Sequence, residues 1–246
     1  MISGAGAAEA RPAPRLPPRP RRIRTRLRAA CGVPRPGALV QNARMSDSSS
    51  PPTSAERAAL RRSLRDRRKA LSAPERIAAA ERVAERLLAL PFAPQQGYVA
   101  GYWAMDGEVA LHVWQLRLPR GVVYCLPVLH DDGRMRFAPW RPGDPLAANR
   151  YGIPEPQSGP GALLAAGDMT LVVTPLVGFD RSGRRLGMGA GWYDRTFADR
   201  LDAAPPPWLV GAAHAVQEVE ALPEAPWDVP MDAICTESET LMPAAA

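Results

Sequence analysis

The chain has 246 residues, of which 46% are hydrophobic, so it is long enough for one or two domains with a sizeable core. Its formal net charge is +6, but residues 1–44 hold ten arginines and one acidic residue, whereas the rest of the chain holds 21 basic and 24 acidic residues. The folded part is thus expected to be mildly acidic, which argues against a nucleic-acid partner. No apolar run approaches the ~18 residues of a membrane span, so we expect no membrane partner either.

Cysteine and histidine usage gives no sign of a metal centre or a disulfide framework. Cys31, Cys125 and Cys235 are far apart and form no C-x-x-C motif, which favours a reducing compartment and a cytoplasmic location. The three histidines also lack ligand spacing, so we expect them to be surface or structural residues.

Residues 1–53 are rich in Pro, Arg, Ala and Ser and have almost no periodic apolar pattern. Such a segment cannot bury enough surface to offset its ordering entropy, so we expect a disordered tail. A transit peptide or a nucleic-acid-binding arm would suit its composition, although its prolines oppose an amphipathic targeting helix. The interpretation that we favour is that translation begins at Met45.

Two helices are expected after the tail. Leu60, Leu64 and Leu71 share one helical stripe amid many arginines. The tetrapeptide Ser72-Ala73-Pro74-Glu75 has the form of a capping box with proline in the first turn, which predicts the start of a second helix. Pro91 is expected to stop that helix. Its inward residues are expected to be Ile77, Ala80, Ala84, Leu87 and Leu88.

Short apolar runs typical of β-strands occupy much of the remaining chain, with helical stretches at about 108–118 and 192–203 between some of them. The strands are expected at 97–103, 122–126, 135–139, 171–174, 208–212 and 233–236. Strands that alternate with helices indicate an α/β fold. We therefore expect a single three-layer α/β/α domain over residues 54–243, built around a mainly parallel sheet.

The most informative segment is Arg184-Arg185-Leu186-Gly187-Met188-Gly189-Ala190-Gly191-Trp192-Tyr193-Asp194-Arg195. It follows the apolar run Leu171–Val177 and the triplet Gly178-Phe179-Asp180, so its layout is a strand, a basic glycine-rich turn and a helix from about Tyr193. Glycines allow successive N–H groups to converge on an anion, and a helix N-terminus adds donors.

Charged side chains flank these glycines and extend the interpretation. Arg184 and Arg185 supply positive charge, while Asp180 and Asp194 offer oxygen ligands for a hard cation such as Mg²⁺. The spacing fits neither a Walker loop nor the dinucleotide fingerprint. A tight turn or bulge without a ligand has the same spacing, so the segment alone leaves phosphate binding open.

Several segments together resemble one family, 5-formyltetrahydrofolate cyclo-ligase, over about residues 57–241. The strongest match runs from Pro175 to Arg195 and is similar to the family signature P-x-x-x-F-D-x-x-G-x-R-L-G-x-G-x-G-Y-Y-D-R. Three weaker matches keep the family's order along the chain. They are Arg61-Arg62-Ser63-Leu64-Arg65, Arg150-Tyr151-Gly152-Ile153-Pro154-Glu155-Pro156, and Leu222-Pro223-Glu224 with Asp228, Asp232 and Thr236-Glu237.

Three positions depart from the family pattern. Arg61 stands where lysine is usual, which keeps a cation but changes its geometry. Trp192 replaces the first tyrosine of Y-Y-D, and Trp227 replaces the histidine that precedes aspartate. None of these departures removes a charge that the chemistry needs.

The resemblance implies a reaction in which ATP and 5-formyltetrahydrofolate give 5,10-methenyltetrahydrofolate, ADP and phosphate in the presence of Mg²⁺. A protein nucleophile is not required, because phosphoryl transfer depends mostly on positioning and charge neutralisation. We expect a small-molecule substrate and a monomeric enzyme.

The resemblance also assigns residues to roles. Arg185 and Tyr193 are expected to be catalytic, and Asp194 and Asp228 to hold Mg²⁺. The residues expected to bind the nucleotide are Arg61, Arg65, Arg185, Leu186, Gly187, Met188, Gly189, Ala190, Gly191, Trp192 and Tyr193. The residues expected to bind folate are Trp103, Glu108, Met188, Gly189, Ala190, Gly191 and Trp192.

Each role has a simpler structural alternative. Arginines on a helix often form a solvated face, Asp194 would suit the first turn of any helix, and Asp228 would suit a turn. Trp103 would suit a core, and Glu155 lies between two prolines in a rigid loop. Three other functions remain open: an ATP-dependent enzyme on another heteroaromatic acid, a nucleic-acid-binding module that uses the tail, and a binding protein without turnover.

Overall fold

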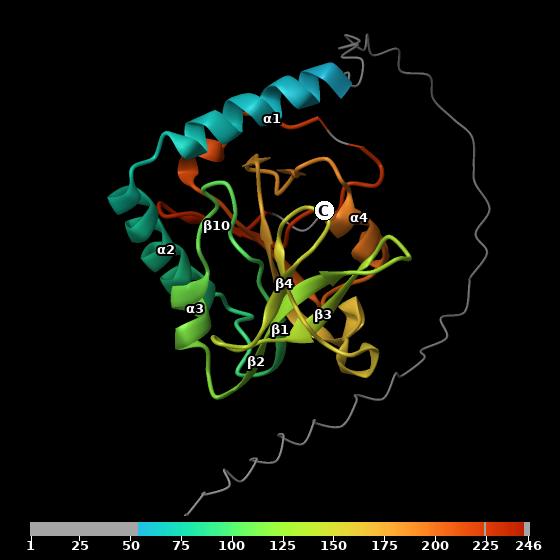
Figure 1. Ribbon diagram of the computed structural model, residues 1–246. Helices are drawn as coiled ribbons and strands as arrows, with labels where there is room; N and C mark the ends of the chain where they lie inside the picture. The colour runs from blue at the N-terminus through green and yellow to red at the C-terminus, as the bar shows by residue number, and fades with distance from the viewer. Residues whose placement is uncertain (1–53, 224, 244–246) are drawn as a thin grey trace, which may run out of the picture. The chain divides into compact units, whose positions relative to one another are not determined.

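A seven-stranded sheet forms the centre of the structure, a computed structural model that describes residues 54–223 and 225–243 (Figure 1). In spatial order its strands are β11 (Thr240–Leu241), β10 (Ala233–Cys235), β9 (Trp208–Ala212), β6 (Met169–Pro175), β1 (Gln96–Ala100), β2 (Gly121–Leu129) and β3 (Met135–Pro139). The strands from β10 to β2 are parallel, and β11 and β3 pair antiparallel at the two edges. The mainly parallel sheet is therefore confirmed. The predictions for the tail, Met45, Cys31 and Glu224 lie outside the described residues.

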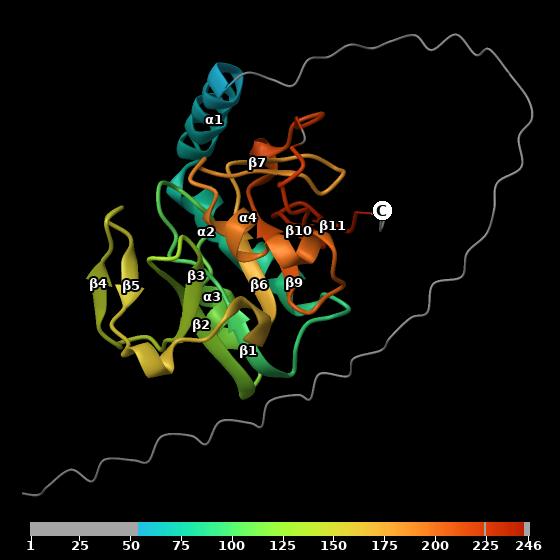
Figure 2. The same cartoon turned by 90° about the vertical axis from the view of Figure 1, so that its right-hand side faces the viewer.

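Helices cover both faces of this sheet. The α-helices are α1 (Ser54–Lys69), α2 (Ala73–Leu88), α3 (His112–Arg117) and α4 (Trp192–Thr196), and the 3-10 turns are η1 (Pro160–Ala162), η2 (Ala166–Asp168), η3 (Ala198–Leu201) and η4 (Ala215–Gln217). Figure 2 shows α4 in front of the sheet, with α2 and α3 behind it. Both views place α1 at one end of the molecule.

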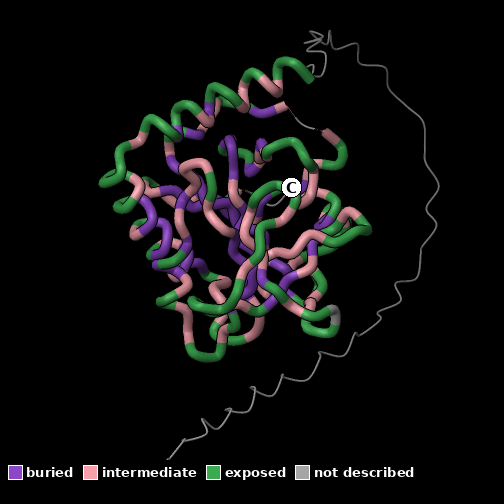
Figure 3. The backbone as a smooth tube through the Cα atoms, viewed as in Figure 1, coloured by how far each residue is buried: buried purple, intermediate pink, exposed green. Residues whose placement is uncertain are grey.

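Two hydrophobic cores, one on each face, follow from the alternation of side chains along buried strands. In β6, Leu171 and Val173 pack with Leu87 of α2 and Trp114 of α3, whereas Val172 packs into the opposite core. Figure 3 shows the buried backbone concentrated in the central strands and the outer side of α1 exposed. These two cores confirm the three-layer architecture.

Two small hairpins lie outside the central sheet. The pair β4 (Leu146–Ala148) and β5 (Pro154–Pro156) and the pair β7 (Gly178–Phe179) and β8 (Arg185–Leu186) are both antiparallel. Figure 2 shows β4 and β5 projecting beside β2 and β3. Neither hairpin, nor β11, was predicted from the sequence.

The predicted capping box is present at the start of α2. Ser72 Oγ accepts a hydrogen bond from the Glu75 amide at 3.4 Å, and Glu75 Oε2 accepts one from the Ser72 amide at 2.7 Å. The expectation for Ile77 was wrong, because this side chain is 67% exposed. The buried face of α2 is turned toward Ala79 and Val83, so Ile77 lies at its margin.

Other element boundaries also moved. The first helix ends at Lys69, before Leu71, and β1 ends at Ala100, so Trp103 lies in the loop that follows. The helical stretches predicted at 108–118 and 192–203 contain only α3 and the short pair α4 and η3. In the described part of the chain, no helix has the length and apolar character needed to cross a membrane.

The strand order itself points to a place for a site. From β1 the chain moves to β2 on one side of the sheet and later to β6 on the other side. In open α/β sheets, ligands bind where the strand order reverses in this way, beyond the carboxyl ends of the strands. The loops after β1 and β6 meet at this point.

Candidate active site

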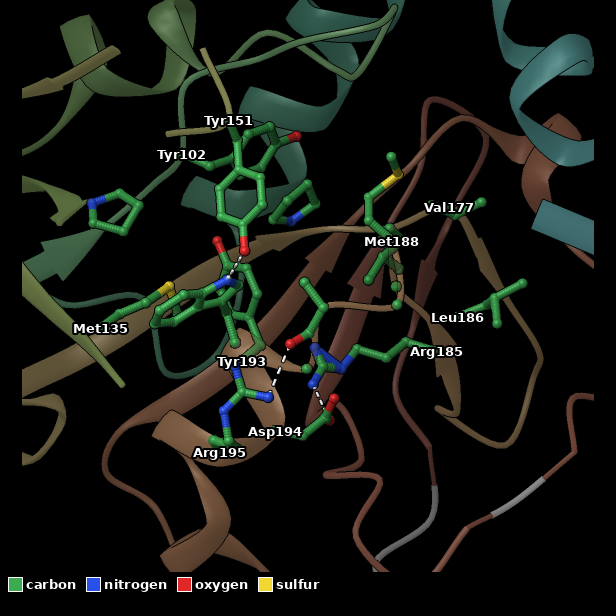
Figure 4. A pocket seen from close by; sticks show the side chains of 18 of the residues that line it. Tyr102, Met135, Tyr151, Val177, Arg185, Leu186, Met188, Tyr193, Asp194 and Arg195 are labelled. Carbon is green, nitrogen blue, oxygen red and sulfur yellow. Dashed lines mark hydrogen bonds and ion pairs between the residues drawn. The ribbon is translucent and has the colours of Figure 1, made fainter. Parts of the chain in front are cut away.

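A cavity of about 750 Å³ opens at the carboxyl ends of β1 and β6 (Figure 4). Its lining comes from α1, the loops after β1 and β6, the glycine-rich loop with α4 and η3, the end of the β4–β5 hairpin, the adjoining ends of β2 and β3, and residues 227–228. Among its lining residues are Arg61, Trp103, Glu108, Asp194, Asp228 and every residue from Arg185 to Tyr193. Except for Arg65, all the residues to which the family resemblance assigns a role therefore line one cavity.

The glycine-rich loop presents unused backbone donors. Gly189 has φ +98° and Gly191 has φ +67°, a left-handed conformation that favours glycine. Within the described residues, no amide from Gly187 to Gly191 donates a hydrogen bond to the protein. A run of free amides beside cationic side chains is the arrangement that binds phosphate oxygens.

Helix α1 packs directly on this loop through Arg61. Arg61 Nε donates to the Gly187 carbonyl oxygen at 2.8 Å, and a Cβ atom at Gly189 would lie 3.3 Å from Arg61 Cζ. Burial and the nearby Arg57 charge lower the pKa of Arg61 from its ordinary value, but arginine is effectively always protonated in proteins. Arg61 therefore brings a positive charge to the edge of the free amides.

Arg185 forms the charged floor of the pocket. Its side chain is 6% exposed, donates to Asp194 Oδ1, and has Cζ 5.6 Å from the centre of the Tyr193 ring (Figure 4). The Arg185 Nε is buried and has no hydrogen-bond partner among the described residues. An unpaired buried donor is costly, so a ligand oxygen that accepts from it would be stabilising.

Tyr193 remains protonated at neutral pH. Burial raises the pKa of its phenol well above the ordinary value, and the nearby Glu108 charge adds to the shift. It therefore serves as a neutral hydrogen-bonding group beside Arg185 and not as a base.

The two predicted metal ligands each have an arginine partner. Asp194 Oδ1 accepts from Arg185 and, at 3.3 Å, from the Val229 amide. Asp228 Oδ2 accepts from Arg57 and from the Ala225 amide, both at 3.0 Å. Each carboxylate keeps one oxygen without a hydrogen-bond partner in the described part of the chain. The described residues contain no cluster of three or more His, Cys, Asp or Glu side chains that could hold a metal.

Sequence reasoning missed Arg57, which lines the same cavity and also donates to the Pro223 carbonyl at 2.7 Å. Its Nε is the second buried donor without a partner in the described residues. A signal was available, because Arg57 lies one helical turn before Arg61 and so shares its face of α1.

Glu108 and Trp103 occupy another wall of the cavity, in the loop after β1. Glu108 Oε2 accepts from the Met105 amide at 2.9 Å, and burial raises the pKa of this carboxyl despite that hydrogen bond. Trp103 packs edge to face against Trp140, with ring centres 5.8 Å apart. The other Glu108 oxygen, and the side of this loop that lines the cavity, are thus available to a flat polar ligand.

Three cations of α1 hold this loop through Asp106. Arg65 Nε, Arg68 and Lys69 lie 2.7, 3.1 and 2.8 Å from its carboxylate. Partial burial would raise the pKa of Asp106, but the hydrogen bonds from Arg65 and Lys69 outweigh it and lower the pKa to about 2. Arg65 does not line the cavity, so its predicted contact with nucleotide requires a change of partner.

Arg68 is fully buried and was also missed from the sequence. It donates to the Asp106 carbonyl at 3.0 Å and to the Leu176 carbonyl at 3.3 Å, and lies 3.8 Å from Glu108 Oε1. It therefore ties the loop after β1 to the end of β6.

The suggestion that Asp180 holds a cation was wrong. Asp180 is 1% exposed, and its oxygens accept from the amides of Ser182, Arg184 and Leu222. It organises the β7–β8 turn, and neither Asp180 nor Arg184 lines the cavity. The helix expected after the glycines is also short, since α4 has 5 residues, so its dipole adds little to the free amides.

Comparisons with known proteins agree with this geometry. Residues 53–237 match the model of the 5-formyltetrahydrofolate cyclo-ligase family. The chain belongs to this family. It is 36% identical over 180 residues to the 5-formyltetrahydrofolate cyclo-ligase of Escherichia coli (strain K12), a match that covers 72% of this chain and 97% of that one. Identity to the Haemophilus influenzae protein of the same name is 35%, with 72% and 95% covered.

A solved structure supports the same assignment. The 5,10-methenyltetrahydrofolate synthetase of Aquifex aeolicus matches with a TM-score of 0.64 and 29% identity, over 77% of this chain and 94% of that chain. Membership of the cyclo-ligase family implies ATP as a substrate of the class.

Two residues that depart from the family signature lie at the edge of the pocket. Trp227 is 65% exposed, next to the Asp228 that Arg57 contacts. Trp192 lies beside Tyr151, to whose hydroxyl its Nε1 donates at 3.4 Å. Both changes leave the charged groups of this cyclo-ligase homologue in place.

Glu155, in the family-like segment 150–156, has a structural role. It accepts from the Leu129 amide at 3.0 Å and from Asn149 Nδ2 at 2.7 Å. These bonds fix the β4–β5 hairpin against β2 at one side of the cyclo-ligase pocket.

Proposed function

We propose that this protein converts 5-formyltetrahydrofolate and ATP to 5,10-methenyltetrahydrofolate, ADP and phosphate, with Mg²⁺. The observation that carries the proposal is one cavity with free amides, Arg61 and Arg185 on one wall and Glu108 with Trp103 on another. The first wall suits phosphates, and the second suits a flat heteroaromatic ring. Family membership and similarity to enzymes with this name support the same reaction.

The chemistry requires activation of a poor electrophile. A formamide oxygen is a poor leaving group, so the γ-phosphoryl group of ATP is first transferred to it and ADP departs. The resulting imidate-like phosphate is attacked by the neighbouring folate nitrogen, which forms the five-membered ring and releases phosphate. Both steps need positioning and charge neutralisation more than they need a protein nucleophile.

The phosphate wall supplies that neutralisation. In our proposal the amides from Gly187 to Gly191 donate to the phosphate oxygens, and Arg185 meets the developing charge with its unpaired Nε. Arg61 closes the loop from α1, and Arg65 joins it when it exchanges Asp106 for nucleotide. Tyr193 keeps Arg185 in place through its ring.

The chemistry of the donor set fits a magnesium ion. Mg²⁺ in phosphate sites uses one or two carboxylates together with substrate oxygens and water. Asp194 and Asp228 both line the cavity, and each has an oxygen without a partner in the described residues. We propose that these two residues hold the ion, which when bound neutralises charge on the phosphates.

We assign the folate wall in the same way. Glu108 accepts from the amino edge of the pterin, and Trp103 and Trp192 bound the ring. The extent of the catalytic domain, residues 54–243, a cytoplasmic location and a monomeric state belong to the same proposal, with no nucleic-acid or membrane partner.

An absorbance assay tests the reaction, because methenyltetrahydrofolate absorbs in the near ultraviolet where the substrate hardly does. Purified full-length protein is given 5-formyltetrahydrofolate, ATP and Mg²⁺, and each is omitted in turn. We expect a rise that needs all three, with one ADP released for each product formed. A flat trace from folded protein that still hydrolyses ATP with another heteroaromatic acid would overturn the folate assignment.

A further inference from the structure

A cluster of two arginines and two aromatic rings lies at the mouth of the cavity. The Cζ atom of Arg150 is 5.3 Å from the ring centre of Tyr151 and 5.1 Å from that of Trp192, and Arg195 Cζ is 5.1 Å from the same indole. Tyr151, Trp192 and Arg195 line the cavity, and Figure 4 shows Tyr151 and Arg195 among the lining side chains. The proposed mechanism does not use these arginines.

Backbone contacts from separate segments hold Arg195 in place. Its Nε donates to the Gly133 carbonyl in the β2–β3 turn at 2.9 Å, and its NH1 donates to the Ala190 carbonyl in the glycine-rich loop at 2.8 Å. Carbonyl oxygens orient a guanidinium group without cancelling its charge. Arg195 is therefore fixed by two partners that carry no negative charge.

The arginines at the floor of the pocket are paired with carboxylates, whereas, among the described residues, those at its rim, Arg150 and Arg195, are not. On the floor, Arg57 pairs with Asp228 and Arg185 pairs with Asp194. Arg150 and Arg195 are exposed and make no ion pair with a carboxylate anywhere in residues 54–223 and 225–243. The rim thus carries two positive charges that no carboxylate of the described residues neutralises.

The pKa of the Tyr151 hydroxyl is also affected by the positive charges nearby. The hydrogen bond from Trp192 lowers its pKa, and the nearby Arg150 and Arg195 charges lower it further. An electropositive rim above an aromatic surface favours carboxylates that are attached to a flat, apolar group.

A smaller cavity of about 160 Å³ adjoins the main one. It shares Leu129, Asn149 and Glu155 with the main cavity and adds His130, Asp131 and Arg150. The Glu155 carboxylate already accepts two hydrogen bonds, and Arg150 is the arginine in this lining. A chain that leaves the main cavity over Trp192 would enter this space beside Arg150.

We propose that Arg150 and Arg195 bind the carboxylates of the substrate's glutamate tail, including the further γ-linked glutamates of a polyglutamate chain. This inference rests on the proposed function, because it takes 5-formyltetrahydrofolate as the substrate. The tail is the anionic end of that molecule, and every added glutamate brings another carboxylate. Guanidinium groups bind carboxylates through two parallel hydrogen bonds, so two fixed arginines set the direction in which the tail leaves the pocket.

Arg150→Gln is the variant of choice, because Arg150 is exposed and lies over the rings of Tyr151 and Trp192 without an ion pair in the described residues. We expect the KM for 5-formyltetrahydrofolate triglutamate to rise roughly fivefold, with less change for the monoglutamate and none in kcat or in the KM for ATP. Arg82→Gln is the matched control, since Arg82 is an exposed arginine of α2 that pairs with Glu85. Its kinetic constants should equal those of the unmodified enzyme.

Three results would overturn the proposal. The first is an unmodified enzyme that does not distinguish the triglutamate from the monoglutamate. The second is an equal rise in KM for both substrates in Arg150→Gln, and the third is a rise in the KM for ATP, which would make the rim a phosphate site.

A binding measurement separates this proposal from the proposed reaction. p-Aminobenzoyl triglutamate has the tail but no pterin, so its binding can be followed by calorimetry without turnover. We expect weaker binding in Arg150→Gln and in Arg195→Gln, and partial recovery in Arg195→Lys, which keeps the charge. Tail binding that depends on both arginines in a protein without cyclo-ligase turnover would refute the reaction alone. If the enzyme turns over but both arginine variants bind the tail as tightly as the unmodified protein does, the rim site alone is refuted.

Discussion

Asp194 has two roles in the proposed site, as counter-charge to Arg185 and as ligand of Mg²⁺. We expect Asp194→Asn to lower kcat by about 100-fold or more, because it removes charge where phosphoryl transfer needs a fixed environment. The free energy of unfolding should also fall, by about 1–3 kcal/mol, since Arg185 is buried. A magnesium titration of the initial rate checks the first role, and thermal unfolding checks the second.

The exposed Asp199 on η3 provides the control for this substitution. Asp199→Asn removes the same charge outside the cavity and should leave kcat and the half-saturating Mg²⁺ concentration unchanged. A functional Asp194→Asn enzyme with an unchanged Mg²⁺ requirement would remove Asp194 from the metal site.

Glu108 should confer a pH dependence on folate use. Burial raises the pKa of this carboxyl above the ordinary value of about 4.3, so the group gains a proton, and loses its acceptor role, at a higher pH than a surface glutamate does. We expect kcat/KM for folate to fall as the pH drops through that raised pKa. In Glu108→Gln this acidic limb should disappear and kcat/KM should be at least about 10-fold lower throughout. A limb that persists in the variant belongs to another group.

Individual site residues differ in how far the sequence reveals them. Arg185 to Asp194 were found because their spacing is contiguous and their residue types are unusual together. Arg57 and Arg68 were not, because an arginine on a helix has the same appearance whether it meets solvent or a buried carbonyl. Their partners, Asp228 and Leu176, are brought to α1 only by the folded chain.

At the scale of elements, α1 connects the two walls of the site. Arg61 holds the glycine-rich loop, while Arg65, Arg68 and Lys69 hold the loop after β1 through Asp106. A shift of this one helix would therefore move the phosphate donors and the folate contacts together.

Asp106→Asn tests this connection. Asp106 has φ +52°, which asparagine also tolerates, so the loop backbone should survive while the charge is lost. We expect the free energy of unfolding to fall by about 1–3 kcal/mol and the KM for folate to rise more than the KM for ATP. Glu85→Gln, on the exposed side of α2, is the control. An unchanged KM for folate would mean that the contacts of α1 with Asp106 do not position Glu108.

The pH dependence of this stabilisation has a definite sign. The folded pKa of Asp106 is about 2, below the unfolded value of about 3.9. The carboxylate therefore stabilises the protein above the unfolded pKa, and this contribution is lost as the pH falls through the folded pKa. The difference in unfolding free energy between protein and variant should be constant from about pH 5 to 7 and should shrink below about pH 4.

The elements that could be predicted from the sequence are those with enough buried side chains to show a regular spacing of apolar residues. The runs that became β3 and β9 matched their predicted bounds, since each alternates or is wholly apolar between turn residues. The two-residue strands β7, β8 and β11 are too short to show such a spacing, and only the pairing partner makes them strands. Ile77 shows the same limit on a helix, where the true buried face depends on what packs above it.

On the scale of the whole molecule, alternation of strands and helices predicted a parallel sheet, but the strand order could not be predicted from it. The order places β1 beside β6, although 68 residues separate Ala100 and Met169. That neighbouring position joins the folate loop to the glycine-rich loop. Long-range pairing of this kind depends on tertiary contacts, and so the site's composition was predictable whereas its assembly was not.

Residues 1–44 are the part of the chain to which the proposed chemistry assigns nothing. The family match begins at residue 53, and the net charge of the chain after residue 44 is negative. We expect a chain that begins at Met45 to keep the kcat, KM values and Tm of the full chain, measured side by side in the absorbance assay. A loss of activity would give the arginine-rich segment a catalytic role. A salt-sensitive retention of nucleic acid by the full chain alone would identify that segment as a binding arm, because such contacts depend on counterion release. N-terminal peptide mapping of the protein from its native cells then decides which start is used.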